Sequence, residues 1–145
     1  MGYDEHWGSG GVAGSVASIG FVEDGITQTL EEVPANKVIN GIPFYTRVWK
    51  TDSEGEVTSD ALGMVDAATF ITKYNVPTVW DEVTCQNYGE ITMNGILYQV
   101  WMEDEQSIEV KLTIMDKHEI GGVAAWKLGF EDTSIWNLIA EYVNK

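Results

Sequence analysis

The sequence predicts an α/β fold in which parallel strands alternate with helices and an antiparallel segment interrupts the series. The apolar run 121–131 lies between two stretches of helical periodicity, as expected of a parallel strand covered on both faces. The β-rich run 38–45 also follows a helical pattern, although Pro43 cannot donate to a strand ladder. Asn94-Gly95 lies between two further β-rich runs and is typical of a tight antiparallel hairpin.

The helices are predicted from apolar residues that recur three or four positions apart. Asp24 is expected to cap the first helix, over about residues 25–35, and Gly121 to cap the end of a later helix that begins near residue 103. Asp132 or Thr133 is expected to begin the last helix. The residues expected to face the core from these three helices are Ile26, Leu30 and Val33; Ile108, Leu112 and Met115; and Ile135, Leu138, Ile139 and Tyr142.

Residues 51–102 differ in character from the rest of the chain. They begin polar, continue with one short helical pattern at about 66–74, and then carry strand patterns at 78–84, 90–93 and 96–102. We therefore predict an inserted α+β antiparallel module over 51–102, with β/α units over 1–50 and 103–145. A closed (β/α)8 TIM barrel needs eight parallel strands, so these units are expected to form the end of such a barrel.

The composition limits the classes of molecule that this chain is expected to bind. Eight basic against 23 acidic residues give a net charge of −15, which disfavours nucleic acid and anionic membranes. No apolar stretch is long enough to span a membrane, and the single Cys85 excludes an internal disulfide. The glycines at 8–14 lack the lysine of a phosphate-binding loop, so no cofactor is expected. Six Trp and six Tyr fit either a neutral sugar ligand or an aromatic core.

Several motifs occur in register along the chain. They are Met1-Gly2-Tyr3-Asp4, the strand-like run 41–49, the segment 101–104 followed by Ser107 and Lys111, and the run 122–129 that contains Trp126. Together they resemble strands six to eight of glycoside hydrolase family 18, the chitinase-like barrels, and are most similar to its bacterial spore-cortex and cell-wall lytic branch. Residues 51–102 are similar to the chitinase insertion domain of that family.

The resemblance implies substrate-assisted, retaining hydrolysis of glycans that contain N-acetylglucosamine, such as chitin or peptidoglycan. In that scheme the acetamido oxygen of the sugar attacks its own anomeric carbon, and a Glu protonates the leaving oxygen. Tyr3 would hold the acetamido oxygen in line, Asp4 would bind the same sugar, and Trp126 would lie under its ring. The resemblance also implies that Tyr45 and Arg47 bind sugar hydroxyls and that Trp49 offers another stacking face.

Each of these residues also has a plain structural interpretation. Position alone favours Trp126 as an interior side chain, Tyr3-Asp4 as a frayed terminus and Arg47 as half of a surface ion pair. Asp4, Glu5 and His6 form a short cluster of mixed residue types, which does not favour a metal site, so no metal is expected.

The catalytic signature of the family, Asp-x-x-Asp-x-Asp-x-Glu, is missing, because this sequence contains no Asp-x-Asp at all. The general acid is therefore expected to be absent and the isolated chain inactive. The alternative hypothesis is a non-catalytic carbohydrate-binding or structural protein.

Three barrel strands alone would leave unpaired edges, so self-association is expected. The bacterial members of the family suggest the cell envelope, the spore or the extracellular space.

Overall fold

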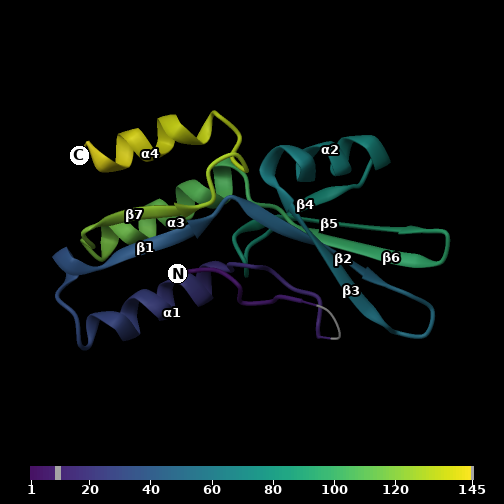
Figure 1. The fold of residues 1–145 in the computed structure, drawn as a ribbon, viewed down its shortest axis with the longest axis horizontal. Coiled ribbons are helices and arrows are strands. Elements are labelled where there is room, and N and C mark those ends of the chain that lie inside the picture. The colour runs from purple at the N-terminus through teal and green to yellow at the C-terminus, as the bar shows by residue number, and fades with distance from the viewer. Residues whose placement is uncertain (9–10, 145) are drawn as a thin grey trace.

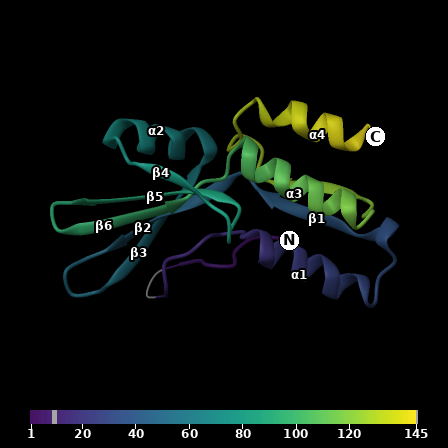
Figure 2. The ribbon, with the colours of Figure 1, turned by 180° about the vertical axis from the view of Figure 1, so that it is seen from behind.

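The computed structural model describes residues 1–8 and 11–144, which form two connected sheets and their helices. The first sheet pairs β1 (Ile39–Pro43) in parallel with β7 (Gly122–Trp126), with Ile39 opposite Gly122 and Pro43 opposite Trp126. Three helices accompany it (Figures 1 and 2), namely α1 (Ile19–Leu30), α3 (Glu105–Lys117) and α4 (Ile135–Val143). The predicted α/β class, with a β/α portion that fits part of a TIM barrel, is confirmed.

The main core lies on one face of this small sheet. Ile42 and Phe44 are fully buried there against Val22 and Ile26 of α1 and Ile108 of α3. The opposite face is only partly covered, because Ile39, Ala124 and Trp126 are exposed there, whereas Gly41 and Pro43 are buried. In a closed barrel the uncovered face would line the interior, so the arrangement matches the expected barrel portion.

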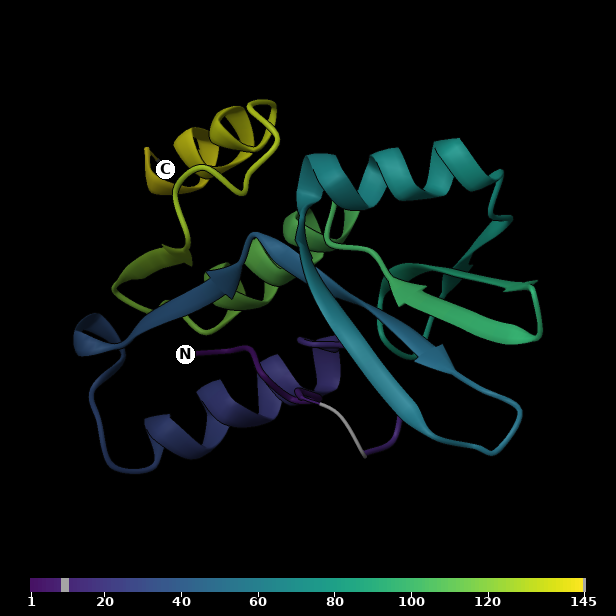
Figure 3. The same cartoon turned by 45° about the vertical axis from the view of Figure 1, so that its right-hand side comes forward.

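The second sheet is antiparallel, has the strand order β3-β2-β6-β5-β4, and is covered on one face by a helix (Figure 3). Its elements are β2 (Tyr45–Thr51), β3 (Val57–Gly63), α2 (Met64–Tyr74), β4 (Thr78–Asp81), β5 (Gln86–Met93) and β6 (Ile96–Trp101). The predicted hairpin is confirmed, since Asn94 and Gly95 join β5 to β6 with φ angles of 52° and 81°.

One nearly continuous extended stretch serves both sheets. β1 ends at Pro43 and β2 begins at Tyr45, so only Phe44 separates the parallel strand from the antiparallel one. The strand-like run 41–49, which was expected to form one strand, is therefore divided between β1 and β2. Because β2 passes through residue 51, the division into 1–50, 51–102 and 103–145 stays a prediction.

The start of the first helix was predicted wrongly. α1 begins at Ile19, where the hydroxyl of Ser18 accepts a hydrogen bond from Phe21 N, and not at Asp24. The helix is anchored by Val22 and Ile26, which are buried at i and i+4. A 3-10 turn, η1 (Ala35–Lys37), then leads into β1.

The role of Gly121 was also predicted wrongly. α3 ends with His118 as its cap, and Glu119 adopts the left-handed conformation at φ 50°. Gly121 instead approaches η1, and a Cβ added to it would lie 2.6 Å from the carbonyl oxygen of Asn36. The close approach of two backbones explains the glycine.

The remaining helices follow the sequence closely. Ile108, Leu112 and Met115 of α3 are buried, as predicted. The face predicted for α4 packs on the core, but the helix begins after Ser134 instead of after Asp132 or Thr133. Within the described residues, no helix has the length and hydropathy needed to cross a membrane.

Candidate carbohydrate site

The N-terminal residues run along the edge of β1 that is not paired with β7, and the Tyr3 ring lies on the uncovered face. Gly2 N donates to the carbonyl of Gly41 over 2.9 Å, which aligns the segment with the strand. The ring of Tyr3 covers Gly41, because a Cβ built on that glycine would come within 3.2 Å of Tyr3 Cε1. Tyr3-Asp4 is thus a docked segment and not a frayed end.

Tyr3, Asp4 and Tyr45 form a compact cluster at the carboxyl end of β1. The rings of Tyr3 and Tyr45 meet edge to face with centroids 6.1 Å apart, and the Tyr45 hydroxyl donates to Asp4 Oδ1. Burial and the Asp4 carboxylate raise the pKa of the Tyr45 phenol far above its usual value of about 10. Burial, with the charge of Asp4, also raises the pKa of Tyr3. Both phenols therefore stay protonated donors near neutral pH.

Trp126 lies on the same face and at the same end of this sheet. It pairs with Pro43, and its carbonyl accepts from Phe44 N over 2.7 Å. Its side chain is 55% exposed, which corrects the interior position favoured by strand position alone. Since β1 separates it from the Tyr3 segment, the two backbones are two strand spacings, or about 10 Å, apart.

Arg47 lies on the adjoining face of β2. Its Nη1 donates to Ser59 Oγ over 2.9 Å, and its Nε is buried without a hydrogen-bond partner among the described residues. A buried donor without a partner is costly and uncommon, and this one is enclosed by the surrounding side chains.

Trp49 is not available for stacking. It is 1% exposed, and its Nε1 donates to the carbonyl of Gly14 over 2.8 Å. The exposed stacking face expected from the resemblance is therefore corrected, because Trp49 anchors the N-terminal loop against the sheet.

Glu5 and His6, next to Asp4, point to different partners. The Glu5 carboxylate accepts from Ser18 N over 2.8 Å and from Ser18 Oγ over 3.0 Å, at the start of α1. His6 Nδ1 contacts the carbonyl of Ser15 at 2.8 Å. The residues thus hold the two ends of the loop that follows Asp4 together.

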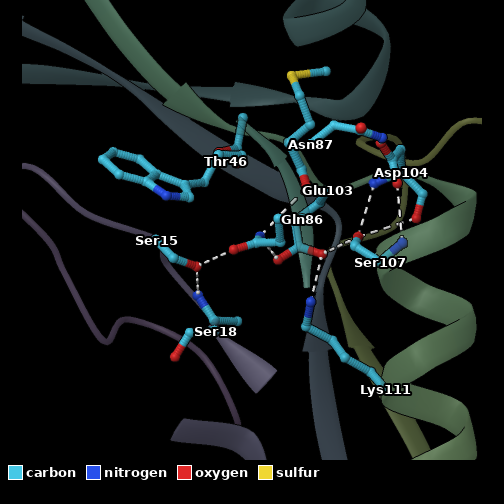
Figure 4. A network of polar contacts seen from close by, with 12 residues as sticks. Ser15, Ser18, Thr46, Gln86, Asn87, Glu103, Asp104, Ser107 and Lys111 are labelled. Atoms are coloured by element: carbon cyan, nitrogen blue, oxygen red, sulfur yellow. Dashed lines mark hydrogen bonds and ion pairs between the residues drawn. The ribbon is translucent and has the colours of Figure 1, made fainter. Parts of the chain in front are cut away.

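A buried polar network fastens this loop to the rest of the molecule (Figure 4). Ser15 Oγ donates to Gln86 Oε1, and Gln86 Nε2 donates to Glu103 Oε1 over 2.8 Å. Glu103 Oε2 accepts from Ser107 Oγ over 2.8 Å and forms a 3.0 Å ion pair with Lys111 Nζ. The network thus links the loop, β5 and α3.

Burial dominates the electrostatics of this network. Glu103 and Lys111 are each 1% exposed, and desolvation raises the pKa of the Glu103 carboxyl, although Lys111 and Ser107 oppose the shift. Glu103, Ser107 and Lys111 were singled out in the sequence as a motif only. Gln86 and Ser15 were missed, because no local pattern marks a side chain whose partner lies 71 residues away.

Comparison with known proteins defines the family. The profile of glycosyl hydrolases family 18 matches residues 1–131. The chain belongs to glycoside hydrolase family 18. It is 31% identical over 143 residues to the cortical fragment-lytic enzyme of Bacillus anthracis, a match that covers 97% of this chain and 33% of that enzyme.

Solved structures of a spore cortex-lytic enzyme and of a chitinase share the fold. The spore cortex-lytic enzyme SleL of Bacillus cereus superposes with a TM-score of 0.87 at 30% identity, over 98% of this chain and 33% of SleL. A chitinase from Chromobacterium violaceum gives a TM-score of 0.85 at 27% identity, over 100% of this chain and 44% of the chitinase. The family 18 chain described here thus spans about a third of the curated relatives it matches.

Proposed function

We propose that this family 18 chain supplies the sugar-binding side of an enzyme that cleaves N-acetylglucosamine-containing glycans by substrate assistance. The observation that carries the proposal is that Tyr3 and Trp126 share the uncovered face and the same end of one parallel sheet. The Tyr3 phenol and the exposed Trp126 indole, on backbones about 10 Å apart, could hold one pyranose ring between them. Relatives that include a cortical fragment-lytic enzyme and a chitinase support a cell-wall or chitin-like glycan.

We propose a role for each polar group of this cluster. Tyr3 would donate to the acetamido oxygen, and the resulting alignment is a positioning contribution to the attack on the anomeric carbon. Asp4 would accept from the sugar while Tyr45 holds its carboxylate in place. Tyr45 is therefore proposed to act on Asp4 instead of on sugar hydroxyls, and the half-buried Arg47 is proposed as the direct donor to those hydroxyls.

The proton donor is proposed to come from outside this chain. The sequence has no Asp-x-x-Asp-x-Asp-x-Glu signature, and Glu5, the carboxylate next to Asp4, is held at the start of α1. A hydrolysis assay with chitin oligomers and with peptidoglycan tests this on the 145-residue chain. We expect no turnover above buffer, and clear turnover would refute the proposal.

The genomic reading frame gives an independent check. A full barrel would need roughly 180 further residues upstream of residue 1, and they should carry the acidic signature. If the upstream DNA encodes none, the alternative of a non-catalytic carbohydrate-binding protein is favoured, because the sugar-binding residues would then serve recognition alone.

A further inference from the structure

A cavity of about 410 Å³ opens between α2 and the antiparallel sheet. Val48 and Lys50 of β2 line it, whereas Arg47 lies on the alternate face of the same strand, so the cavity is separate from the Tyr3–Trp126 site. Its volume falls within the range typical of small-ligand pockets.

Aromatic rings form one wall of this cavity. Phe70 and Tyr98 have centroids 6.0 Å apart at 38°, and Phe70 and Tyr74 have centroids 5.1 Å apart at 55°. Tyr98 belongs to β6 and Phe70 to α2, so both backbones are held by regular structure. The rings therefore form a fixed apolar surface on which the C–H face of a pyranose can pack.

Polar groups of both signs line the same cavity. Lys50 and Asp60 form an ion pair whose side chains are 35% and 62% exposed, and Asn94 adds a carboxamide from the hairpin turn. The ion pair adds no net charge to the pocket, although the chain as a whole carries −15. A neutral ligand with many hydroxyls can accept from Lys50 and donate to Asp60, whereas an anion would meet the acidic surface.

We propose that this cavity is an accessory binding site for a neutral N-acetylated sugar, one or two pyranose units long. The identity of the sugar rests on the proposed function, but the site does not use Tyr3, Asp4 or Trp126. Because it lies on the opposite face of the inserted sheet from Arg47, it would hold a second length of a polymeric substrate and raise the residence of the protein on the polymer.

Titration of this chain with N,N′-diacetylchitobiose, followed by ¹H–¹⁵N NMR, tests the proposal. The backbone amides of Lys50, Asn94, Gly95 and Tyr98 should shift, with a dissociation constant on the order of millimolar. Tyr98→Leu, which keeps an apolar side chain, should raise the dissociation constant obtained from these shifts roughly fivefold. Asp60→Ala removes an exposed acceptor without touching the core and should also raise this constant.

Trp126→Ala is the matched control, because it alters the other site and should leave the shifts around Asn94 unchanged. Shifts confined to the Tyr3–Trp126 region, or shifts at Asn94 that survive both cavity variants, would overturn the accessory site and leave the proposed function intact. A lack of any shift around Asn94 would overturn it as well.

Discussion

At the scale of single residues, the hydrogen bond from Tyr45 to Asp4 is the contact that shapes the candidate site. Tyr45→Phe removes it while keeping the edge-to-face contact with Tyr3. We expect weaker glycan binding and a loss of about 1 kcal/mol in the free energy of unfolding at neutral pH.

The raised pKa of Tyr45 also predicts how the free energy of unfolding changes with pH. The folded pKa of Tyr45 is raised, so its contribution to stability is fully present below the unfolded pKa of about 10 and declines as pH rises above it. Urea unfolding between pH 8 and 11 should show a steeper loss for the wild type than for Tyr45→Phe. Equal slopes would contradict the buried, Asp4-bound phenol.

The exposure of single residues was the hardest property to predict. Strand position favoured an interior Trp126 and the resemblance an exposed Trp49, and the structure reverses both. Trp126 is exposed because the sheet face it occupies is uncovered there, and Trp49 is buried where its Nε1 donates to the carbonyl of Gly14 in the N-terminal loop. Both outcomes depend on contacts remote in sequence, which local patterns do not contain.

At the scale of elements, the close approach of η1 to the start of β7 gives a matched pair of variants. Gly121→Ala places a Cβ 2.6 Å from a backbone oxygen that cannot rotate away, so we expect a loss of about 1–3 kcal/mol. A Cβ on the adjacent Gly122 meets nothing within 4 Å, so Gly122→Ala should leave stability nearly unchanged. Thermal unfolding of both variants measures the difference, and equal losses would show that crowding is not the cause.

The buried ion pair between Glu103, which precedes α3, and Lys111 of α3 should couple the effects of substitutions at the two residues. Lys111→Met leaves the Glu103 carboxylate buried without its cation and should cost about 3–5 kcal/mol. The double variant Glu103→Leu/Lys111→Met should lose much less than the sum of the single changes. Because an unpaired buried carboxyl has a raised pKa, Lys111→Met should regain stability as pH falls. Additive losses across a double-mutant cycle would contradict the pairing.

Element types could largely be predicted from the sequence, whereas some boundaries could not. The periodicity of Ile108, Leu112 and Met115 identified α3 and its buried face. The beginning of α1 was missed because its capping residue, Ser18, is held by Glu5 from 13 residues away. The split at Phe44 was missed because the β-rich run continues through it. The Tyr3, Asp4 and Trp126 site came from a family resemblance, and its binding role stays a prediction.

At the scale of the whole molecule, the uncovered sheet face predicts self-association. β7 pairs only with β1 among the described strands, and its last residue, Trp126, is exposed, as is Leu128 just after it. Sedimentation should therefore show dimers or larger species, and Ala124→Lys, which places a charge on the exposed face of β7, should shift them toward monomer. A compact wild-type monomer at high concentration would count against this.

The most direct test of the whole account is an NMR titration of the protein with N,N′,N″-triacetylchitotriose. The protein signals report binding, and the sugar signals in the same sample report whether the trisaccharide is cleaved. The account predicts that the Trp126 indole and the Asp4 amide shift, that Trp126→Ala and Tyr3→Phe weaken the binding, and that the trisaccharide stays intact. Shortened sugars, or binding that ignores both Trp126 and Asp4, would contradict a sugar site that receives its proton donor from elsewhere.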